Sequence, residues 1–132
     1  MLENKKYKIL VVDDEEDILT LVKFRLKSQG YKVLEAMDGA GALKEIEQSS
    51  PHLLLLDYKL PDFNGAELVR RIKEEMKLSL PIIIFTASSA FINTIKALPI
   101  DDYVLKPFDP QELLGKIQGL LEKYYRNESI VS

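Results

Sequence analysis

The chain has 132 residues and a formal net charge of −3, a length that fits one ordinary domain with a substantial core. The absence of cysteine excludes disulfides, zinc–thiolate sites and thiol catalysis, and the absence of a run of lysine or arginine argues against direct nucleic-acid binding. The apolar run at residues 9–12 is too short for a signal peptide or a membrane span, so we expect a cytoplasmic protein with no membrane association.

Apolar stretches along the chain predict five strands. Four are short and unbroken, which is typical of strands buried on both faces of a parallel sheet, and a fifth stretch is weaker but rich in β-forming residues. In chain order they cover residues 7–12, 31–34 (the weaker one), 53–56, 81–85 and 103–105.

Segments with helical periodicity follow each of these strands. They cover about residues 16–29, 40–48, 66–76, 90–98 and 110–125. Gly30 lies where a helix C-cap glycine belongs, and Pro99 ends the fourth segment. Asp109 and Pro110 suit the N-cap and the first position of the fifth helix.

This alternation of strand and helix predicts a single α/β domain over residues 1–132. Its core is a doubly wound, five-stranded parallel sheet, flavodoxin-like (β/α)5, with strand order 2-1-3-4-5. The core should span about residues 7–125, and the polar tail, residues 126–132, should be flexible.

Charged and hydroxyl side chains follow four of the predicted strands. They are Asp13 and Asp14, Asp57, Thr86 and Lys106. Ligands of such sheets bind beyond the carboxyl ends of the strands, so we expect these side chains to converge on one cleft.

Three carboxylates in one cleft repel each other unless a cation neutralises them, and carboxylates with waters suit Mg²⁺. Alone, the acidic run at residues 13–17 could merely complement a helix dipole, but its convergence with Asp57 favours a metal site. Asp57 could be a strand-end cap or a nucleophile that forms an acyl phosphate. Lys106 could be a surface lysine, although its place between a strand and Pro107 favours a fixed one.

Several segments together resemble the receiver domains of two-component response regulators, over about residues 8–125. The segments are Asp13-Asp14, residues 57–65, Thr86-Ala87 and residues 102–108. Each motif is weak alone, but their order at the right strand ends is highly specific.

The resemblance implies that Asp57 is the phosphoacceptor. It also implies that Asp14, Asp57 and the main-chain carbonyl of Lys59 bind Mg²⁺ directly, while Asp13 acts largely through water. Lys59 should further shield the acyl phosphate from water.

The resemblance gives three more residues a role. Lys106 would contact a phosphoryl oxygen and would precede a cis bond to Pro107. Thr86 would swing its hydroxyl towards the phosphoryl group, and Tyr103 would then turn its ring inward. Plain packing is the alternative for Thr86 and Tyr103.

One departure from the family is visible at residues 97–101, where the connection between the fourth helix and the fifth strand is about two residues shorter than usual. We therefore expect a clipped or irregular fourth helix.

The implied function is a signalling switch that takes a phosphoryl group from a phosphohistidine donor onto Asp57 with Mg²⁺. The expected partners are a sensor histidine kinase or a histidine phosphotransfer domain, and a downstream output domain or protein. The chain would catalyse its own phosphorylation and slow dephosphorylation without being a turnover enzyme. The signal would pass on by conformational change or phosphorelay.

Rival functions lack their motifs. A flavodoxin-type cofactor site needs a phosphate loop where this chain has acidic residues, and a nucleotide hydrolase needs a glycine-rich loop ending in Lys and Ser or Thr. An aspartyl-phosphate phosphatase would carry an Asp where Lys59 stands. A pseudo-receiver, an interaction module that is never phosphorylated, stays as the alternative.

Overall fold

The computed structural model describes residues 7–131, with side chains described as far as residue 126. Its five strands form one parallel sheet in the order β2-β1-β3-β4-β5, as predicted. The strands are β1 (Lys8–Val12), β2 (Lys32–Ala36), β3 (Leu53–Asp57), β4 (Ile82–Thr86) and β5 (Asp102–Leu105).

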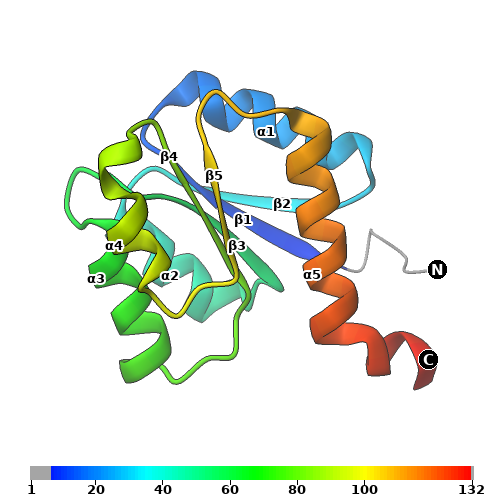
Figure 1. The fold of residues 1–132 in the computed structure, drawn as a ribbon. Helices are drawn as coiled ribbons and strands as arrows, with labels where there is room; N and C mark the ends of the chain where they lie inside the picture. The colour runs from blue at the N-terminus through cyan, green and yellow to red at the C-terminus, as the bar shows by residue number, and fades with distance from the viewer. Residues whose placement is uncertain (1–6, 132) are drawn as a thin grey trace.

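Helices cover both faces of this sheet (Figure 1). They are α1 (Glu16–Ser28), α2 (Gly39–Ser49), α3 (Gly65–Arg70), α4 (Ile92–Lys96) and α5 (Pro110–Val131). α1 and α5 lie on one face, while α2, α3 and α4 lie on the other. The doubly wound architecture predicted from the sequence is therefore confirmed.

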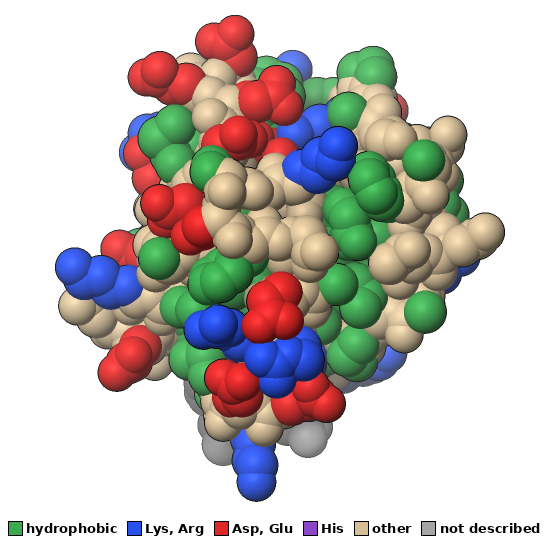
Figure 2. All heavy atoms as spheres, turned by 90° about the vertical axis from the view of Figure 1, so that its left-hand side faces the viewer, with side chains coloured by type: hydrophobic (Ala, Val, Ile, Leu, Met, Phe, Trp, Pro, Cys, Tyr) green, Lys and Arg blue, Asp and Glu red, His purple; other side chains and the backbone are tan. Residues whose placement is uncertain are grey.

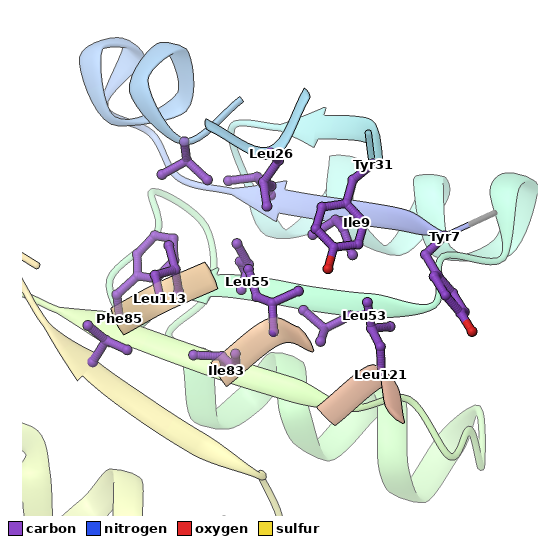
Figure 3. Close-up of a cluster of buried hydrophobic side chains, with 14 of the residues drawn as sticks. Tyr7, Ile9, Leu26, Tyr31, Leu53, Leu55, Ile83, Phe85, Leu113 and Leu121 are labelled. Carbon is purple, nitrogen blue, oxygen red and sulfur yellow. The ribbon is translucent and has the colours of Figure 1, made fainter. Parts of the chain in front are cut away.

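Side chains of each strand alternate between two hydrophobic clusters, one under each helical layer. In β3, Leu53 and Leu55 face the layer of α1 and α5, and Leu54 and Leu56 face the other layer. Figure 3 shows the first cluster, in which Leu113 of α5 packs beside residues of the sheet. All four leucines are 0% exposed, which explains why the strand reads as an unbroken apolar run rather than an alternating one.

The third and fourth helical segments depart from a regular α-helix. α3 continues directly into a π-helical turn, η2 (Arg71–Glu75), in which the N–H of Met76 donates to the carbonyl of Arg71. The fourth segment begins as a 3₁₀ turn, η3 (Ser89–Phe91), before the five residues of α4. The expectation of a clipped, irregular fourth helix is confirmed.

Asp101 secures the short connection that follows α4. Its backbone N–H donates to the Ile82 carbonyl, and its carboxylate accepts hydrogen bonds from the Ile82 N–H at 2.9 Å and from the Tyr124 hydroxyl at 2.6 Å. One side chain thus fastens the chain before β5 to the start of β4 and to α5.

The helix ends follow the predicted signals. Gly30 has a positive φ of 91° just after α1, and the Asp109 carboxylate accepts the N–H of Gln111 at the start of α5. α5 breaks its helical geometry at Tyr125, where the predicted helix ended, and then continues to Val131. The side chains of the tail, residues 127–132, lie outside the described residues.

Two glycine-to-alanine variants should have opposite effects on stability. A Cβ at Gly115, inside α5, would meet nothing within 4 Å, so Gly115→Ala should raise the free energy of unfolding by about 0.5–1 kcal/mol. A Cβ at Gly65 would lie 3.2 Å from the Tyr58 Cα, a backbone atom that cannot move aside cheaply. Gly65→Ala should therefore lower that free energy by about 1–3 kcal/mol. Urea unfolding of both variants measures this, and equal effects would contradict the packing described at Gly65.

Candidate functional site

The structure brings the predicted acidic residues together at the carboxyl end of the sheet. Asp57 ends β3, and Asp13 and Asp14 directly follow β1. One carboxylate oxygen from each of the three lies within 4.8 Å of the others. Asp13 is 0% and Asp57 6% exposed, while Asp14 is exposed. The cluster therefore opens to solvent on the side of Asp14.

Lys106 lies among these carboxylates, directly after β5. Its Nζ is 2.7 Å from an oxygen of Asp13 and 3.4 Å from one of Asp57, and its side chain is only 8% exposed. Glu15 also contacts it, at 3.2 Å. The peptide bond from Lys106 to Pro107 is cis, as the resemblance implied.

The buried ion pairs shift the pKa of Lys106. Burial by itself lowers this pKa, but the hydrogen bond that the ammonium donates to Asp13 and the charges of Asp57 and Asp13 raise it overall. Lys106 is therefore a fixed cation of the site and not the solvated surface lysine that the sequence left as an alternative.

The carboxyl group of Asp57 has a raised pKa. Burial and the charge of Asp13 raise the pKa of its carboxyl group to about 6, although Lys106 and the backbone N–H of Lys59 oppose the shift. The single positive charge of Lys106 does not neutralise the surrounding carboxylates. The atoms that Asp13, Asp14 and Asp57 offer to a metal ion are all carboxylate oxygens, which are hard ligands. The donor set thus fits a hard divalent cation such as Mg²⁺.

Thr86 ends β4 beside this cluster and is 3% exposed. Its hydroxyl donates to the Ser88 carbonyl at 3.3 Å and accepts the Ser88 N–H at 3.2 Å. In this state the hydroxyl donates within its own loop, so donation to a ligand at Asp57 would require its bond to the Ser88 carbonyl to break.

Tyr103 lies on β5 opposite Ile84, half-buried, with the ammonium of Lys96 5.8 Å from its ring centre. It packs on the layer of α2, α3 and α4. Its inward turn stays a prediction. His52 lies away from the carboxylates, and its Nδ1 accepts the N–H of Lys8.

Sequence reasoning missed two residues of the site. Glu15 was seen only as part of an acidic run, and nothing in its neighbours indicated that it would reach Lys106. Phe91 was counted as part of a helix, but its ring lies against Tyr58, and the Lys59 ammonium is 5.2 Å from its centre. No sequence pattern marks such a contact between two loops.

The side of the molecule that carries α3 and α4 shows acidic and basic side chains interleaved (Figure 2). The ion pairs of Arg70 with Glu67 and Glu75 belong to this mixture. This face therefore presents no broad basic patch for a phosphate backbone. Within residues 7–131, no helix is both long and apolar enough to cross a membrane.

The raised pKa of Asp57 predicts a pH effect in the metal-free protein. From about pH 4 to pH 6 Asp57 binds more protons in the native state than in the unfolded state, so its contribution to the free energy of unfolding should fall as pH rises. Asp57→Asn removes the titrating group. At pH 7 its free energy of unfolding should therefore exceed that of wild type by about 2 kcal/mol, whereas at pH 4 this advantage should be absent. Urea unfolding in a chelator at several pH values measures the difference. A constant difference from pH 4 to pH 7 would contradict the raised pKa.

Comparisons with known proteins agree on one family. The family model described as the response regulator receiver domain matches residues 9–118. The alkaline phosphatase synthesis transcriptional regulatory protein PhoP of Bacillus subtilis is 40% identical over 118 residues, which are 88% of this chain and 49% of that protein. The chain thus spans about half the length of this curated relative.

Solved structures similar to this chain include two response regulators. A CheY-like response regulator receiver domain protein from Methanospirillum hungatei has a TM-score of 0.84 and 32% identity, with 92% of this chain and 98% of that chain covered. The chemotaxis response regulator CheY4 of Vibrio cholerae has a TM-score of 0.79 and 29% identity, with 87% and 98% covered.

Proposed function

Since the chain belongs to the response regulator receiver domains of two-component signalling, we propose that it is a phosphorylation-activated switch with Asp57 as its phosphoacceptor. The observation that carries this proposal is the burial of Asp57 beside Asp13 and Lys106 at the end of β3. A nucleophile and its neutralising cation are held together there before any ligand arrives.

Phosphoryl transfer depends mainly on positioning and charge neutralisation. With a pKa of about 6, Asp57 is mostly ionised at neutral pH and can attack. A carboxylate oxygen of Asp57 bonds to phosphorus while the bond from phosphorus to the donor's imidazole nitrogen breaks, and the nitrogen leaves with the electron pair. Lys106, 3.4 Å from Asp57, would stabilise the charge on the phosphoryl oxygens.

Asp13, Asp14, Asp57 and the main-chain carbonyl of Lys59 would hold Mg²⁺, which when bound neutralises the phosphoryl oxygens. The chain's own part is to keep these oxygens in place. The Lys59 N–H bonds the Asp57 carboxylate, and the Glu15 N–H donates to Asp13 at 2.9 Å. Thr86 would then report the modification by exchanging its bonds to Ser88 for one to the phosphoryl group.

The donor would be a phosphohistidine of a sensor kinase or of a histidine phosphotransfer domain in the same compartment, the cytoplasm. The chain would act as acceptor and slow hydrolase of its own phosphoryl group rather than as a turnover enzyme. An output domain or partner protein would receive the signal. The pseudo-receiver alternative gains no support, because the carboxylates, Thr86 and Lys106 are all in position.

Labelling with a small phosphodonor tests the nucleophile. Wild type with acetyl phosphate and Mg²⁺ should gain the mass of one phosphoryl group, and the adduct should be lost at alkaline pH, as an acyl phosphate is. Asp57→Asn should gain none, because an amide is a far poorer nucleophile. Intact mass spectrometry measures both, and full labelling of the Asp57→Asn variant would assign the phosphoryl group elsewhere.

Melting curves test the metal site. Mg²⁺ binds the native state, so it should raise the melting temperature of wild type by mass action, and Asp14→Asn should lose most of this rise. Asp17→Asn is the matched control, since Asp17 is also an exposed aspartate, in the first turn of α1, but lies outside the cluster. An equal loss in both variants would indicate a general effect of acidic charge rather than a site.

A further inference from the structure

One aromatic ring joins the two loops that flank Asp57. Phe91 lies on η3, in the loop that follows β4. Its ring centre lies 4.8 Å from that of Tyr58 and 5.2 Å from Nζ of Lys59. Tyr58 and Lys59 are the two residues directly after Asp57. A residue from one loop therefore fixes the two residues that follow the proposed phosphoacceptor.

We propose that Phe91 is a positioning residue that holds the Lys59 ammonium away from Asp57 and thereby shortens the life of the phosphoryl group. This inference rests on the proposed function. It also refines the expectation that Lys59 shields the acyl phosphate, because the structure shows Lys59 engaged elsewhere.

Lys59 has the reach to act on Asp57. Its backbone N–H donates to the Asp57 carboxylate, so its exposed side chain starts beside that group. A four-carbon stem ending in an ammonium could lie over phosphoryl oxygens, where it would form a charge-assisted hydrogen bond. The cation–π contact with Phe91 competes for the same ammonium.

The position of Phe91 is set by the loop that carries Thr86. The Ser88 hydroxyl accepts the N–H of Ala90, and the Ser88 carbonyl accepts the N–H of Phe91. The same carbonyl accepts the hydroxyl of Thr86. The bonds of Ser88 to Ala90 and Phe91 do not involve Thr86, so the turn does not depend on the Thr86 hydroxyl. Phe91 is also half-buried and packs against the hydrophobic cluster under α2, α3 and α4, so its ring is not a freely moving surface side chain.

Hydrolysis is the step that the competition should affect. A water oxygen bonds to phosphorus while the bond from phosphorus to the Asp57 oxygen breaks. The carboxylate leaves with the electron pair, and inorganic phosphate and a proton are released. The water must approach in line, so an ammonium and stem lying over the phosphoryl oxygens would obstruct it. When Phe91 holds Lys59, the approach stays open.

The first test compares decay rates after removal of the phosphodonor, by intact mass in Mg²⁺ buffer. Phe91→Leu should slow decay about two- to fivefold, the range that an exposed cation–π contact allows. Phe91→Tyr keeps the aromatic face and should decay like wild type. In a Lys59→Ala background, Phe91→Leu should change nothing. Equal decay of wild type and Phe91→Leu, or the same slowing without Lys59, would overturn the proposal.

The second test needs neither metal nor phosphoryl group. In the unmodified, metal-free protein, the side-chain methylene protons of Lys59 should show an upfield ring-current shift in NMR spectra. The shift should disappear in Phe91→Leu and persist in Phe91→Tyr. An unshifted Lys59 in wild type would overturn the role of Phe91 alone, whereas failure of wild type to take up a phosphoryl group would overturn the proposed function beneath it.

Discussion

The ion pairs of Lys106 with Asp13 and Asp57 are the interactions on which the rest of this site depends. Their three side chains come from the ends of three strands and are almost fully buried. A buried charge that loses its partner is costly, so the arrangement requires the strand ends to stay in register. The leucines of β3, 0% exposed under helices on both faces, supply that rigidity. The core is thus the frame that keeps like charges close together.

The site is built to be incompletely neutralised. Asp13 takes the shortest contact with Lys106, at 2.7 Å, and Asp57 takes a longer one at 3.4 Å. Asp57 therefore forms the weaker ion pair with Lys106, while burial and the charge of Asp13 raise the pKa of Asp57 to about 6. A ligand that brings positive charge, or a bond that removes the carboxylate's charge, relieves this state. The unfavourable burial of the Asp57 charge beside Asp13 would thus favour occupation of the site by a metal ion or a phosphoryl group.

Sequence patterns predicted the frame and the cluster because both follow from rules with a regular period or position. Unbroken apolar runs located the strands, and the residue after each run located Asp13, Asp57 and Lys106. The π-helical turn η2 and the contact of Phe91 with Lys59 follow from no such rule. They depend on how two loops, distant in sequence, pack in space. The pKa of Asp57 could likewise not be predicted, because it results from burial and distances.

The short fourth helix limits where a structural change can travel. After α4 in the chain, the Asp101 carboxylate accepts hydrogen bonds from the Ile82 N–H and the Tyr124 hydroxyl. These bonds fasten the connection between α4 and β5 to β4 and to α5. Before α4 in the chain, the loop is held by the longer and weaker hydrogen bonds between Thr86 and Ser88, at 3.2 and 3.3 Å. Movement of Thr86 would therefore be taken up first by η3, the turn that carries Phe91, because that end is the less firmly held. The structural change that follows phosphorylation of Asp57 and the lifetime of the phosphoryl group would then both depend on the loop from Thr86 to Phe91.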